Sequence, residues 1–143
     1  MRLYLDASSL NRVFDDQSQP RIYLEASAMI MIFAMLEKGA LSLVSSEALV
    51  LENNANPFAE RKSFVTAILA KAEVVQKIDE RTLHRAERIE KSYRIPGLDA
   101  LHLACAEQLK AVFITCDDKI LKRYSGNARV QNPVDFAWQH VEG

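Results

Sequence analysis

The stretch LDALHLACAEQLKAVFITCDDKIL, residues 98–121, decides the fold because its character changes twice along its length. Residues 98–110 are rich in leucine and alanine, which predicts a helix with one apolar stripe of Leu98, Leu101, Cys105 and Leu109. Residues 111–115, AVFIT, form a short apolar run and predict a buried strand. The segment DDKILKRY that follows predicts a second, shorter helix. Helix, strand and helix in succession are typical of α/β proteins.

The rest of the chain repeats this alternation. We predict further strands at 2–6, 41–45 and 73–78, with a short fifth strand near 128–131. The helices predicted between and after them cover about 21–38, 46–52, 58–71 and 80–93, with a last turn from Asn132-Pro133. No repeat or flexible linker interrupts the pattern, so a single domain over residues 1–143 is expected, of class α/β with a mostly parallel sheet.

Composition excludes several classes of protein. With 49% hydrophobic and 26% charged residues the chain resembles an ordinary globular protein, and a net charge of −1 provides no overall attraction for nucleic acid. Two cysteines make no disulfide framework and indicate a reducing, cytoplasmic location. No signal peptide is predicted, and the most apolar run, 26–36, is too short to span a membrane. We expect that run to be a helix buried on several sides, or one that also lies at a subunit interface.

Acidic residues stand at the ends of the predicted strands. Asp6 ends the first strand and Asp117 ends the fourth, while Asp99 lies in the first turn of a helix and Glu52 ends the segment after the second strand. Ligands of open α/β sheets bind beyond the carboxyl ends of the strands, at a switch in strand order. We therefore expect acids that are distant in sequence to meet at one rim.

Each acid also has a plain structural explanation. Asp6 could cap a following helix, Asp99 could only complement a helix dipole, and Asp118 could be a solvated first-turn residue. His102, three residues after Asp99 on the same helix face, could approach the site or could be a packed helix histidine. The structural explanations weaken when the acids are taken together, because Asp6 and Asp117 end strongly apolar strands.

Several carboxylates in one place need a cation to stay ionised. Oxygen ligands favour magnesium or manganese, whereas the three histidines and two cysteines lack the paired spacing of a zinc site. Such a metal site typically acts on phosphate groups. The sequence has neither a P-loop nor a GxSxG nucleophile elbow, so metal-dependent hydrolysis of a phosphodiester is the leading prediction.

Three stretches carry a family resemblance: LDASSL (5–10), GLDALHLACA (97–106) and FITCDDKIL (113–121). In order and spacing they resemble the acidic motifs of PIN-domain ribonucleases, over essentially the whole chain. The most specific piece is DALHLA followed by a strand that ends in T-x-D. The resemblance implies a three-layer α/β/α sandwich around a four- to five-stranded sheet, Mg²⁺ or Mn²⁺ as cofactor, and single-stranded RNA as substrate. Small members of the family are often toxins of the VapC type, which form homodimers and are held inactive by an antitoxin protein.

The resemblance also implies roles for individual residues. The family's acidic cluster maps onto Asp6, Asp99, Asp117 and an acid after the second strand. Two glutamates could supply that acid: Glu47 stands where the commoner pattern has it, and Glu52, which the sequence NN follows, matches a divergent subgroup and is favoured. The auxiliary positions are Asp118, Ser8 and Thr115, and the cations that could contact RNA phosphates are Arg12, Lys119, Lys122 and Arg123.

Other functions fit less well. A phosphatase of the haloacid dehalogenase type needs a second acid two residues after the first, where this chain has Ser8, and the acids do not fall in the order of a receiver domain. The remaining alternative to a nuclease is a non-catalytic PIN-like module that binds RNA or protein.

Overall fold

The computed structural model describes residues 1–140; the last residues of the predicted domain, 141–143, lie outside the described part. Its centre is one five-stranded sheet in the order β3-β2-β1-β4-β5, in which every neighbouring pair is parallel. The strands are β1 (Arg2–Leu5), β2 (Ser42–Ser46), β3 (Val74–Gln76), β4 (Val112–Ile114) and β5 (Val130–Gln131). All five predicted strands are therefore present, the fifth within the predicted range 128–131.

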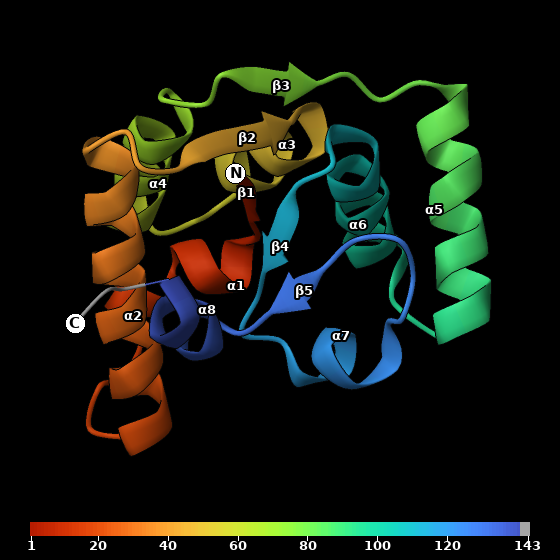
Figure 1. Ribbon diagram of the computed structural model, residues 1–143. Coiled ribbons are helices and arrows are strands. Elements are labelled where there is room, and N and C mark those ends of the chain that lie inside the picture. The colour runs from red at the N-terminus through yellow and green to blue at the C-terminus, as the bar shows by residue number, and fades with distance from the viewer. Residues whose placement is uncertain (141–143) are drawn as a thin grey trace.

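Helices cover both faces of the sheet, which gives the predicted three-layer α/β/α sandwich (Figure 1). The chain moves outward from β1 to β2 and β3, then crosses back to β4 and β5, and right-handed crossovers place the two sets of helices on opposite faces. The helices are α1 (Ala7–Leu10), a 3₁₀ turn η1 (Arg12–Phe14), α2 (Pro20–Glu37), α3 (Glu47–Asn54), α4 (Ala59–Leu69), α5 (Glu80–Tyr93), α6 (Gly97–Leu109), α7 (Asp118–Arg123) and α8 (Pro133–His140).

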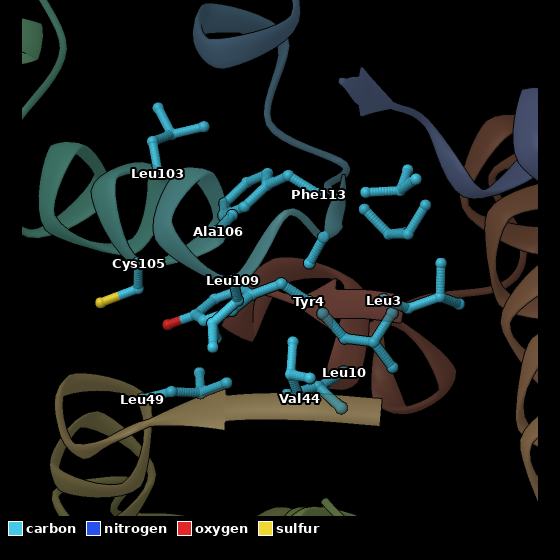
Figure 2. Packing of buried hydrophobic residues seen from close by; sticks show 14 of the residues in the cluster. Leu3, Tyr4, Leu10, Val44, Leu49, Leu103, Cys105, Ala106, Leu109 and Phe113 are labelled. Carbon is cyan, nitrogen blue, oxygen red and sulfur yellow. The ribbon is translucent and has the colours of Figure 1, made fainter. Parts of the chain in front are cut away.

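The centre of the core lies between β1 and β4. Tyr4 and Phe113 are paired across these strands, and their rings stack with centroids 5.5 Å apart. Figure 2 shows the hydroxyl end of Tyr4 directed toward Leu49 of α3 and Cys105 of α6. The strands at the centre of a parallel sheet are buried on both faces, so their sequences are almost continuously apolar.

The predicted stripe on α6 is wrong in part. Leu98 is exposed and Leu101 is half-buried, whereas His102 and Leu103 are buried, as are the alanines at 100, 104 and 106. The physical reason is that α6 packs against both the sheet and α5, so no single stripe describes its burial. Small alanine side chains allow this close approach on several sides.

The apolar helix α2 is buried on one side only. Met29 and Ile32 are in the core, but Leu24 and Met31 are exposed. The prediction of burial on several sides is therefore wrong for the face of α2 that carries Leu24 and Met31. Between α2 and α8 lies a groove of about 570 Å³, the α2–α8 groove, lined by Leu24, Ser27, Ala28, Met31, Val134, Ala137 and Trp138. Within residues 1–140 no helix is both long and apolar enough to cross a membrane.

Candidate active site

The site lies where β1 and β4 end side by side. Strand order reverses at this point, since β2 and β4 lie on opposite sides of β1. Leu5 is in register with Ile114, and the Asp6 amide donates to the Ile114 carbonyl at 3.2 Å. This is the switch point at which open α/β sheets bind ligands. The predicted meeting of sequence-distant residues at one rim is thus present in the geometry of the sheet.

Asp6 is buried and held by three hydrogen bonds. Its Oδ1 accepts from the Ser8 hydroxyl at 2.8 Å and from the Ser9 amide at 3.0 Å, and its Oδ2 accepts from the Thr115 hydroxyl at 2.6 Å. Burial raises the pKa of Asp6, while the hydrogen bonds from Thr115 and Ser9 oppose that rise. Ser8 and Thr115, the predicted polar neighbours, therefore both fix the orientation of this carboxylate.

Asp117 is attached to the same group of side chains. Its amide donates to the Thr115 hydroxyl at 3.0 Å, and its Oδ1 caps α7 by accepting from the Lys119 amide at 2.8 Å. The second oxygen of Asp117 has no hydrogen-bond partner among residues 1–140. Thr115 thus links the carboxylate of Asp6 to the backbone of Asp117.

The pKa of Asp99 is changed by the other acids of the cluster. It lies half-buried in the first turn of α6, and its pKa is raised to about 6. Burial is the largest cause, followed by the negative charges of Asp117 and Asp6 and, more weakly, that of Glu52. Carboxylates raise one another's pKa only when they are close in space. The charges of the other three predicted acids therefore act on Asp99.

The two glutamates on α3 face different neighbours. Glu47 accepts the Ile78 amide at 2.8 Å and so holds the segment that follows β3. Glu52 is half-buried, and its Oε1 lies 3.0 Å from His102 Nε2. Of these two glutamates, only Glu52 is among the charges that raise the pKa of Asp99. The structure therefore brings Glu52, the favoured alternative, to the other acids and engages Glu47 elsewhere.

The donor chemistry of this cluster fits a hard divalent cation. Asp99 makes no hydrogen bond or ion pair with any described residue, and the mutual repulsion of the acids would be relieved by a positive ion. Within residues 1–140, however, no three acidic, histidine or cysteine side chains already have the spacing of a metal-ligand set. An ion would therefore be held partly through water or after side-chain movement, as magnesium commonly is.

The remaining predicted residues have separate partners. Both oxygens of Asp118 accept from Arg21, at 2.7 and 2.8 Å, and this pairing lowers the pKa of Asp118. Arg12 donates twice to Glu25, at 2.7 and 2.9 Å, and once to Asp15. Asp118, the predicted auxiliary acid, and Arg12, one of the cations predicted to contact RNA, are therefore both paired with other side chains of the fold.

The cations of α7 differ from one another. Arg123 donates to the Arg94 carbonyl at 2.8 Å. Lys119 and Lys122 are exposed, and neither side chain forms an ion pair with any residue from 1 to 140. Of the four cations predicted to contact RNA, these two lysines are the ones whose side chains form neither a hydrogen bond nor an ion pair with residues 1–140.

Two features of the site were not foreseen. Tyr4 and Ser46 are linked to His102 inside the core, and Glu25, only 1% exposed, binds Arg12, Arg21 and Asn132. The available signal was a polar residue inside an apolar strand or helix, since such a residue needs a partner when buried. The partners themselves are distant in sequence and could not be read from it.

Known proteins share this architecture. Three solved structures with 15–18% sequence identity to this chain are the VapBC2 complex of Rickettsia felis, FitAcB of Neisseria gonorrhoeae and a toxin–antitoxin complex of Klebsiella pneumoniae. Their TM-scores are 0.62, 0.58 and 0.56, over 92%, 99% and 92% of this chain and 98%, 100% and 97% of theirs. At this level of sequence identity, the structural similarity shows that the chain has the same fold as these proteins.

Comparison at the level of sequence gives two results. No curated protein sequence matches the chain. The sequence model of the PIN domain, by contrast, matches residues 3–127. This range includes all four acids of the cluster and most of the chain. The chain therefore belongs to the PIN domain family.

Proposed function

We propose that this protein is a Mg²⁺- or Mn²⁺-dependent endoribonuclease that hydrolyses phosphodiester bonds of single-stranded RNA. The observation that carries the proposal is the PIN domain match over residues 3–127, which includes all four acids, with Asp6 and Asp117 linked through Thr115 where β1 and β4 end. Burial and the charges of Asp117, Asp6 and Glu52 also raise the pKa of Asp99. A fold does not keep repelling carboxylates at a switch point for stability, because their repulsion is unfavourable. A divalent cation and an anionic substrate account for the arrangement.

The four acids would hold the ion, directly or through water: Asp6, Glu52, Asp99 and Asp117. When bound, it would polarise a phosphoryl oxygen and lower the pKa of a water molecule. Asp6 is the most rigid of the four because Ser8 and Thr115 fix both of its oxygens. Lys119 and Lys122 would contact RNA phosphates, which gives affinity without sequence preference. The products would carry a 5′-phosphate and a 3′-hydroxyl.

A toxin role is part of the proposal. The solved structures of the same fold include a toxin–antitoxin complex from Klebsiella pneumoniae, and this supports an antitoxin protein as partner here. The exposed apolar side chains along the α2–α8 groove support a further partner surface, which we assign to a homodimer. Apolar patches of this kind usually mark sites of protein association.

The first test is cleavage of a mixed single-stranded RNA pool by the purified protein with Mn²⁺. Asp99→Asn removes one charge of the cluster without changing shape, so cleavage is expected to be lost, as it is when EDTA removes the metal. Asp135→Asn is the matched control, because Asp135 also lies in the first turn of a helix but is exposed and outside the cluster.

Full activity of the Asp99→Asn protein would contradict the proposed mechanism. Mn²⁺ binding by the wild type without cleavage of any RNA would favour the second candidate, a non-catalytic PIN-like module that binds RNA or protein.

A further inference from the structure

A chain of hydrogen bonds runs through the core and ends at Glu52. It joins Ser46 Oγ to Tyr4 Oη at 2.6 Å, Tyr4 Oη to His102 Nδ1 at 2.6 Å, and His102 Nε2 to Glu52 Oε1 at 3.0 Å. The first three residues are at most 1% exposed, and the fourth has a side chain that is 29% exposed. The chain therefore leads from the dry interior to the rim where the acids meet.

The chemistry of the atoms gives this chain a direction. A carboxylate can only accept, so the Nε2 atom of His102 carries the proton that it shares with Glu52. When Nε2 carries the proton of the ring, Nδ1 accepts from the Tyr4 hydroxyl. Tyr4 in turn accepts from Ser46, whose oxygen accepts the Leu49 amide at 3.1 Å and caps α3. Every donor in the chain has an acceptor.

This chain of hydrogen bonds begins and ends on helix α3. Ser46 is the N-cap of α3, and Glu52 lies farther along it. The two links between them come from β1, through Tyr4, and from α6, through His102. α6 also carries Asp99 in its first turn, three residues before His102. His102 thus sets the position of the Glu52 carboxylate relative to the helix that presents Asp99.

We infer that His102 is a positioning residue that holds Glu52 in the acidic cluster and thereby makes it, instead of Glu47, the acid after β2 that serves the metal. This inference rests on the proposed metal-dependent function. Histidines and carboxylates that orient metal ligands through a second hydrogen bond act in this way in many metal sites. The difference from the usual arrangement is that here the histidine orients a carboxylate and is itself fixed by a tyrosine.

Two substitutions of His102 separate this role from simple packing. In His102→Gln the side-chain amide reaches about as far as Nε2 and can still donate to Glu52. In His102→Asn the amide reaches only about as far as Nδ1, so it can meet Tyr4 but not Glu52. Both variants are polar and both break one end of the chain, which makes each the control for the other.

The readout is Mn²⁺ affinity, measured by titration calorimetry on the full chain without RNA, beside thermal unfolding and RNA cleavage. His102→Asn is expected to weaken Mn²⁺ binding by roughly 10- to 100-fold, since mutation of the hydrogen-bond partners of metal ligands has effects of this size. Glu52→Gln is expected to weaken it at least as much. His102→Gln is expected to stay close to wild type. His102→Asn combined with Glu52→Gln should bind no more weakly than Glu52→Gln alone, and Glu47→Gln should bind normally.

Equal losses in the Asn and Gln variants would overturn the inference, as would a double variant whose loss is the product of the two single losses. If the Asn variant does not fold, His102→Leu takes its place, because leucine fills a similar volume but cannot donate a hydrogen bond to Glu52. A loss of Mn²⁺ affinity in His102→Leu with retention in His102→Gln supports the positioning role, and equal affinities in these two variants would overturn it. Failure of the proposed function has a different signature. In that case Asp99→Asn and Glu52→Gln would themselves leave Mn²⁺ binding unchanged.

Discussion

The carboxyl group of Asp99 lies where its negative charge is unfavourable. Burial and the neighbouring charges of Asp117 and Asp6 raise its pKa from 3.8 to about 6. Between about pH 4 and pH 6 the folded protein therefore binds more protons at this group than the unfolded chain does. By linkage the free energy of unfolding falls as the pH rises through this window, and the loss is complete above it.

Asp99→Asn is accordingly expected to stabilise the metal-free protein at pH 7 and to leave it unchanged near pH 4. The gain at pH 7 should be about 1–2 kcal/mol, less than the full shift implies because solvent partly screens this half-buried group. Urea unfolding in EDTA at the two pH values measures it. A gain of equal size at both pH values would show that the cause is not the charge of Asp99.

The residues of the site could be predicted unequally well. Asp6 and Asp117 were visible because an acid at the end of an apolar strand is conspicuous, and Asp99 followed from its place after a helix-breaking IPG. The partners that distinguish Glu47 from Glu52 could not be predicted from the sequence. These partners are Ile78 and His102, which lie 31 and 50 residues away in the sequence.

At the scale of elements, α2 is held to the sheet edge and the site by a buried carboxylate. Glu25 is 1% exposed and is neutralised by Arg12 and Arg21, and Asn132 donates to it as well. Arg12 precedes α2 and Asn132 precedes α8, so one side chain ties together both walls of the α2–α8 groove. Removing one partner of such a buried pair is costly because the other charge stays buried.

Glu25→Ala is expected to lower the free energy of unfolding by up to about 3–5 kcal/mol, since the half-buried Arg12 loses both of its hydrogen bonds to Glu25 and keeps only Asp15 as an ion-pair partner. The matched control is Glu37→Ala on the same helix, whose ion pair with Lys71 is exposed and screened by solvent, so its loss should be far smaller. Guanidinium unfolding of both variants provides the comparison. Similar losses in the two proteins would mean that Glu25 contributes no more than a surface charge.

Helices and strands could be predicted where their apolar residues recur at the spacing typical of the element. Strands 2–5 and 112–114 and helices 20–37 and 80–93 follow apolar runs or capped amphipathic segments, and their predicted bounds are close to those observed. Asp6 does cap a following helix, the four-residue α1, but no range could be predicted for it because it is about one turn long and shows no period. The stripe on α6 was misplaced because a helix packed on two sides has no single apolar face.

At the scale of the whole molecule, the chain has one tryptophan, and it is on the surface. Trp138 is 87% exposed at the edge of the α2–α8 groove. Its fluorescence therefore reports on whether this groove is covered. In the proposed homodimer the indole would leave water and enter an apolar contact.

A blue shift of the emission with rising protein concentration is expected, in step with dimer formation measured by sedimentation. Met31→Glu places a charge in the groove and should prevent both changes, whereas Val75→Glu alters an exposed apolar residue far from it, on β3. A dimer whose tryptophan emission stays that of an exposed indole would assign the interface to another face of the molecule.

The order of the strands has one more consequence. Asp6 and Glu52 belong to the part of the chain before the exposed residues 70–71, and Asp99 and Asp117 belong to the part after them. The two parts meet where β1 pairs with β4 and β2 with β3, and where α2 packs against α8. A gene divided at this point would encode two pieces with half of the acids each, neither able to assemble the cluster alone. Fused to two other proteins, such pieces would form a conditional nuclease whose activity depends on whether its carriers associate.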